Sequence, residues 1–116
     1  MDDSDPRATE VIDRLRQEID AIDSRLLKLF NQRARCVVEI GHIKRAGHMP
    51  LYQPDRERQI FERAEAANTG PLSNRAIRRL FERVLDESRS VERHVMEPAA
   101  NDPPANAPGA EEGGEP

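Results

Sequence analysis

The stretch PRATEVIDRLRQEIDAIDSRLLKLFNQRARCVVEIGHIKRA, residues 6–46, is one uninterrupted helical pattern, and it decides the fold. Its seam residues recur at alternating spacings of three and four, as at the a and d positions of a heptad repeat. The pattern predicts a single helix of roughly 60 Å, at about 1.5 Å per residue. The seam residues are Ile12, Leu15, Ile19, Ile22, Leu26, Leu29, Arg33, Cys36, Ile40 and Ile43.

Two kinds of residue on this helix indicate how it is covered. Further apolar residues widen the stripe in the middle of the helix, so more than one other helix must pack on it. They are Leu27, Phe30, Val37 and Val38. Cys36 is expected to be a small buried side chain without a disulfide partner. Arg33 is the polar exception on the seam, where a guanidinium needs an anionic partner to offset its desolvation.

The rest of the sequence predicts two shorter helices. Asp5 before Pro6 is typical of a helix start, and Gly47 is expected as the C′ residue that ends the long helix. A second helix is predicted over residues 54–67, and Ser73 is expected to cap a third. The predicted fold is therefore all-α, with three helices per chain and a very long N-terminal one.

The apolar stripe of the third helix has two polar interruptions. Ser88 and Glu92 lie one turn apart on the face that should be buried. The apolar members of that face are Ile77, Leu80, Phe81, Val84, Leu85, Val91 and Val95.

Composition divides the chain into a folded body and two acidic ends. Residues 97–116 contain five Pro and no Leu, Ile, Val or aromatic residue, so this tail and residues 1–5 are expected to be disordered around a helical domain at 6–96. The ends carry eight acids and no Lys or Arg, so the −4 of the whole chain leaves +4 for the body. Such a body suits a small anionic ligand, whereas the acidic ends would repel nucleic acid.

The acidic start and the lack of a long apolar run favour a cytoplasmic protein with no membrane contact.

The spacing of basic residues on the long helix predicts a homodimer. Arg33 and Lys44 are eleven residues apart, so they share one face about 16 Å apart along the axis. Arg16 has the same face but lies about 25 Å from Arg33, too far to reach one small ligand in the same chain. Two long helices crossing antiparallel would bring Arg16 of one chain toward Arg33 and Lys44 of the other, with two equivalent sites per dimer. With no Trp, one Tyr and three Phe, a core of this size is also marginal alone.

Four segments together resemble a known family. LRQEIDAIDSRLLKLFNQRARCVVEIGHIK, LYQPDRER, NTGPLS and LFERVLDESRSVE are similar to the all-helical chorismate mutases, both stand-alone and fused to prephenate dehydratase. The resemblance covers roughly residues 10–95. It implies an intertwined antiparallel homodimer that converts chorismate to prephenate in phenylalanine and tyrosine biosynthesis, without cofactor or metal.

The resemblance also implies a role for individual residues. Arg16 of the other chain and Arg33 would bind the substrate carboxylates, and Lys44 would reach a carboxylate and the ether oxygen. Glu92 would face the ether oxygen, where it helps only while it carries a proton. The remaining implied contacts are Arg56, which would support carboxylate binding, Glu57, which would hold the ring hydroxyl, and Ser88, which would contact a carboxylate.

Other interpretations stay open at this stage. Taken alone, Arg33 could be a polar seam residue that sets the specificity of helix pairing. Lys44 could be a basic residue that interacts with the helix dipole at the C-terminal end, and Glu92 could pair with a neighbouring arginine. A lyase on the same fold that removes pyruvate from isochorismate and a noncatalytic helical dimerisation module are the alternative functions. The spacing expected of metal ligands is lacking among His42, His48, His94 and Cys36. A cluster of arginines on the third helix is more typical of a solvated helix face than of a nucleic-acid site: Arg75, Arg78, Arg79 and Arg83.

Overall fold

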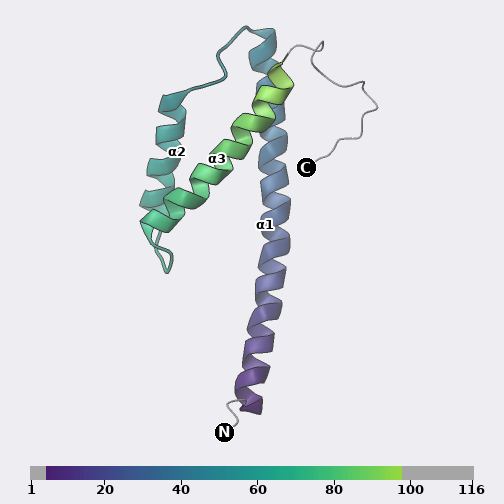
Figure 1. The fold of residues 1–116 in the computed structure, drawn as a ribbon, viewed down its shortest axis with the longest axis vertical. Helices are drawn as coiled ribbons and strands as arrows, with labels where there is room; N and C mark the ends of the chain where they lie inside the picture. Colours follow the sequence, from purple (N-terminus) through teal and green to yellow (C-terminus); the bar gives the residue numbers. More distant parts are fainter. Residues whose placement is uncertain (1–4, 98–116) are drawn as a thin grey trace, which may run out of the picture. The chain divides into compact units, whose positions relative to one another are not determined.

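The computed structural model describes residues 5–97, and its three helices match the sequence-based prediction (Figure 1). Helix α1 spans Pro6–Ala46, α2 spans Pro54–Ala67 and α3 spans Asn74–Met96. The all-α class with a long N-terminal helix is confirmed. Apart from Asp5 and Glu97, the ends predicted to be disordered, 1–5 and 97–116, lie outside the described residues.

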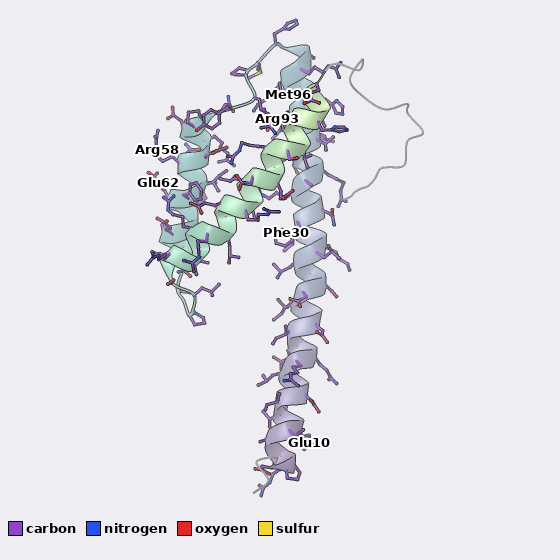
Figure 2. The ribbon with its side chains drawn as sticks, in the orientation of Figure 1. Glu10, Phe30, Arg58, Glu62, Arg93 and Met96 are labelled. Carbon is purple, nitrogen blue, oxygen red and sulfur yellow. The ribbon has the colours of Figure 1, made fainter. Side chains whose placement is uncertain are left out.

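The chain divides into two compact units, one ending at Cys36 and the other beginning at Val37. In the first unit the described residues form only α1, so this unit has no second element to cover the apolar seam. Its seam side chains are accordingly exposed: Ile12, Leu15, Ile19, Ile22, Leu26 and Leu29. Phe30, labelled in Figure 2, is exposed as well. The expected burial of Cys36 is wrong for the single chain, where the thiol is exposed for the same reason.

The two ends of α1 are capped by local hydrogen bonds. At the start, Asp5 Oδ1 accepts from the Arg7 amide at 3.0 Å, and the Asp5 carbonyl accepts from the Thr9 amide at 2.9 Å, as an N-cap acid should. At the other end, the amide of Met49 donates to the Lys44 carbonyl at 2.8 Å and that of His48 to the Arg45 carbonyl at 3.3 Å. This is a Schellman arrangement.

The left-handed residue of that arrangement is His48, with φ of 56°, and not Gly47 as the sequence suggested. The helix ends at Ala46 as predicted, and its C′ position falls on His48, one residue after the glycine. Histidine tolerates this region of backbone space better than branched residues do.

In the second unit, α2 and α3 pack side by side (Figure 1). Arg78 of α3 lies over the ring of Phe61, 4.3 Å from its centroid, and its Nε donates to Glu65 Oε2 at 3.0 Å. In the connection between the helices, Asn68 Nδ2 donates to the Leu72 carbonyl at 2.8 Å. The Ser73 hydroxyl accepts from the Ala76 amide at 3.0 Å, so the predicted cap of α3 is present.

The end of α1 in the second unit packs closely on the end of α3. A Cβ at Gly41 would lie 3.1 and 3.2 Å from side-chain atoms of Val95, so a larger residue would require Val95 to shift by a few tenths of an ångström. Arg45 Nη1 also donates to the Val95 carbonyl at 3.4 Å. The close approach positions Lys44, one turn after Gly41, against α3.

Candidate active site

Lys44 of α1 and Glu92 of α3 form an ion pair within the second unit. Lys44 Nζ lies 2.6 Å from Glu92 Oε2, and the two side chains are only 9% and 12% exposed. This oxygen of Glu92 is buried, and the angles of the contact are not those of a regular hydrogen bond. Burial of a charged pair costs desolvation free energy that a pair on the surface avoids. Such a pair is therefore weak evidence for stability and a better indication of a functional site.

The ammonium group of Lys44 has a donor left for a ligand. Besides the contact with Glu92, Nζ donates to the Leu51 carbonyl at 3.2 Å. An ammonium group has three N–H donors and the Leu51 carbonyl uses one, so at least one N–H can reach a substrate oxygen while the contact with Glu92 is kept. The carbonyl of Leu51, in the segment between α1 and α2, also fixes the direction of the side chain.

A second polar cluster links α2 to α3. Arg89 Nη1 lies 2.5 Å from Glu57 Oε2, and Arg89 Nη2 pairs with Asp86 Oδ1 one turn earlier on α3. The hydrogen bond to the Glu57 carboxylate raises the pKa of the Arg89 guanidinium above its ordinary value. Arg89 and Asp86 are not among the predicted site residues, and Arg89 was considered from the sequence only as a neighbouring arginine that could pair with Glu92. The structure pairs Arg89 with Glu57 instead. The available signal was that Arg89 lies next to Ser88 and one turn before Glu92, beside the polar interruption of the α3 stripe.

The other predicted site residues of the second unit have local partners. The Ser88 hydroxyl donates to the Val84 carbonyl of its own helix at 2.8 Å. Arg56 is exposed and donates to Gln59 Oε1 at 3.4 Å. Arg56 also lines an open groove of about 400 Å³ at the start of α2, together with Tyr52, Gln53, Pro54, Asp55 and Gln59.

The structure brings together only part of the predicted set. Lys44, Ser88 and Glu92 share the second unit, as do Arg56 and Glu57. Arg33, which is half-buried, and Arg16, which is exposed, belong to the first unit.

Other candidate sites find no support among the described residues. Between residues 5 and 97 there is no group of three or more His, Cys, Asp or Glu side chains that could hold a metal ion. No helix in the same range is long and apolar enough to cross a membrane. In the arginine-rich part of α3, Arg78 is engaged by Glu65, and Arg83 pairs with Glu87 at 2.8 Å. These pairs agree with a solvated helix face.

The fold and the polar pair define the class of protein: a small helical domain whose candidate site contains an ion pair between one buried cation and one buried acid. Comparison with known proteins then identifies the family. The chain belongs to the chorismate mutase type II family, whose family model matches residues 15–93. The resemblance stated from the sequence is therefore confirmed.

Similarity to curated relatives and to solved structures supports the same family assignment. The chain is 38% identical over 89 residues to the bifunctional chorismate mutase/prephenate dehydratase of Neisseria gonorrhoeae, covering 73% of this chain and 24% of the relative. The corresponding protein of Aquifex aeolicus is 33% identical over 90 residues, covering 74% of this chain and 25% of the relative. The chain thus spans about a quarter of the length of these relatives.

Two solved structures are similar over nearly their whole length. A chorismate mutase of Thermus thermophilus matches with a TM-score of 0.69 and 34% identity, covering 70% of this chain and 92% of the other. The chorismate mutase of Helicobacter pylori in complex with prephenate matches with a TM-score of 0.69 and 28% identity, covering 75% of this chain and 94% of the other.

Proposed function

We propose that this chain is a chorismate mutase that rearranges chorismate to prephenate. The observation that carries the proposal is the buried Lys44–Glu92 pair at 2.6 Å, within a chain of the chorismate mutase type II family. The Helicobacter pylori mutase, whose structure contains prephenate, supports the choice of substrate. Assignment to phenylalanine and tyrosine biosynthesis follows from the same substrate.

The rearrangement requires little covalent chemistry from the protein itself. In chorismate one C–O bond breaks while one C–C bond forms within the same molecule, so no electron or proton need be exchanged with a cofactor. The substrate is a dianion, and fixed cations that replace its hydration select the compact conformer in which the two carbons meet. Negative charge develops on the ether oxygen, and donors already aimed at that oxygen lower the barrier.

Lys44 and Glu92 are the proposed donors to the ether oxygen. Lys44 keeps one N–H beyond its contacts with Leu51 and Glu92, and that N–H would donate to the oxygen as charge grows. Glu92 donates only in its protonated form, so this role requires the protonated carboxyl group in the substrate complex. Arg33 and Arg56 would bind carboxylates, Ser88 would contact a carboxylate after its hydroxyl turns from Val84, and Glu57 would hold the ring hydroxyl.

We also infer an antiparallel homodimer in which Arg16 is donated to the site of the other chain. Support comes from the exposed apolar seam of the first unit, where six seam side chains from Ile12 to Leu29 are each at least 43% exposed. Burial of such a stripe contributes roughly 25 cal/mol of favourable free energy per Å² of apolar surface, which favours association. The cytoplasmic location expected from composition stays a prediction.

A kinetic assay with product identification tests the proposed function. Purified protein is incubated with chorismate and, in a separate reaction, with isochorismate; the loss of ultraviolet absorbance of chorismate is followed, and the products of both reactions are separated by chromatography. A mutase yields prephenate as the enzymatic product. Release of pyruvate from isochorismate would instead support the lyase, and no turnover of either substrate would support a dimerisation module.

A further inference from the structure

Arg89 connects α3 to α2 through a contact that uses only one oxygen of Glu57. Arg89 Nη1 lies 2.5 Å from Glu57 Oε2, and the two side chains are 31% and 21% exposed. The other terminal nitrogen of Arg89, Nη2, pairs with Asp86 Oδ1 on the same helix. A guanidinium is a rigid planar fork, so partners on both terminal nitrogens fix its plane.

This geometry has two consequences for Glu57. Because Arg89 occupies Oε2, the lone pairs of Oε1 are left to accept from another donor. Because the guanidinium is positively charged, it also offsets the negative charge of Glu57, which would otherwise repel a dianionic ligand nearby. The raised pKa of Arg89 agrees with this pairing, since the guanidinium is stabilised in its charged form.

We propose that Arg89 is a positioning residue that holds Glu57 as an ionised acceptor, with Oε1 left for the ring hydroxyl of the substrate. The inference rests on the proposed function, in which Glu57 holds that hydroxyl. A purely structural pair that joins α2 to α3 would affect stability but not the recognition of one hydroxyl group. The selectivity for that hydroxyl is therefore the quantity to measure.

The experiment compares kcat/KM for chorismate with kcat/KM for an analogue in which hydrogen replaces the ring hydroxyl. The ratio of the two values is the hydroxyl selectivity. The variants are Arg89→Met, which keeps much of the side-chain length, and Arg89→Lys, which keeps the charge but not the fork. The matched control is Arg83→Met on the same helix, because Arg83 pairs with Glu87 at 2.8 Å in an exposed position.

Arg89→Met should lower the hydroxyl selectivity by about ten-fold, the factor that loss of one well-aligned hydrogen bond to a charged group gives. The analogue keeps both carboxylates, so loss of the Arg89 charge should slow both substrates, and the additional loss on chorismate is the fall in selectivity. Remaining turnover of the analogue shows that the variant is folded. Arg89→Lys should lie between wild type and Arg89→Met. Arg83→Met should keep the wild-type selectivity.

Four results overturn the inference, and they differ from one another. An equal loss of kcat/KM on both substrates would make Arg89 structural, and wild-type values of kcat/KM on both substrates would make it dispensable. A wild-type selectivity near one would mean that Glu57 does not hold the hydroxyl. A wild-type protein without turnover of chorismate would overturn the proposed function itself, and this inference with it.

Discussion

Glu92→Gln is the substitution that most sharply tests how charge is used in this site. In the ligand-free protein Glu92 Oε2 is buried 2.6 Å from Lys44 Nζ, a contact that suits an ionised carboxylate. Donation to the ether oxygen requires the opposite state, because an ionised carboxylate would oppose the negative charge that develops there. Glutamine has nearly the same shape and is a hydrogen-bond donor at every pH.

The expected magnitude follows from the number of donors involved. Removing one aligned donor to a developing oxyanion costs about 100-fold to 1,000-fold in kcat. Wild-type kcat should therefore fall by about that factor as pH rises and Glu92 in the substrate complex changes from protonated donor to carboxylate. Glu92→Gln should stay within about ten-fold of the wild-type maximum over the same range, because its donor does not titrate.

Glu92→Ala separates the charge effect from packing. It leaves the buried Lys44 ammonium with the Leu51 carbonyl as its described partner, so it should lower the free energy of unfolding by about 3 kcal/mol. Glu92→Gln keeps a polar partner at that position and should cost less. Denaturant titration of both variants measures this difference.

The assay is a pH profile of kcat from initial rates of chorismate loss, for wild type, Glu92→Gln and the control Glu87→Gln. Glu87 is an exposed acid on the same helix that pairs with Arg83, so its substitution should leave the wild-type profile intact. If wild type and Glu92→Gln show the same decline with pH, Glu92 is not the donor to the ether oxygen. An inactive Glu92→Gln enzyme would contradict the reasoning equally.

Three further predictions concern assembly, packing and the tail. Mixing the inactive variants Arg16→Ala and Arg33→Ala should restore one wild-type site per heterodimer, and no recovery after verified subunit exchange would mean that each site is built within one chain. Gly41→Val should lower the free energy of unfolding by about 1–3 kcal/mol in denaturant titration and reduce activity, because a Cβ there would lie 3.1 Å from Val95. Unchanged stability and activity would show that Val95 and α3 can shift at little cost. Deleting residues 98–116 should leave melting temperature and kcat essentially unchanged, and a large loss of either would show that the segment docks.

The helices were predictable because each boundary depends on a local signal. Asp5 before Pro6 and Ser73 before Asn74 supply cap oxygens that need only a few neighbouring residues to act. The end of α1 at Ala46 was predicted, but its left-handed cap residue was misplaced by one position, because histidine and glycine both tolerate positive φ. The hydrogen bonds to the Lys44 and Arg45 carbonyls place it at His48.

The candidate site was only partly predictable, for a different reason. Ser88 and Glu92 interrupt an apolar stripe, so a periodic pattern marks them. Arg89 lies beside that stripe on a helix rich in arginine, and only the packing of α2 on α3 distinguishes it by bringing Glu57 within 2.5 Å. Contacts between elements distant in sequence leave no periodic trace, which is why the partner of Glu57 emerged from the structure alone.

The most direct test of the central claim is the steady-state rate of prephenate formation from chorismate by wild type and by Lys44→Met. The buried ammonium of Lys44 is proposed to contact the substrate carboxylate and ether oxygen, so wild type should form prephenate, and Lys44→Met should lose about 100-fold or more in kcat/KM. Methionine suits the buried position, so circular dichroism should show a folded variant. Equal rates for the two proteins, or no prephenate from wild type, would contradict the account.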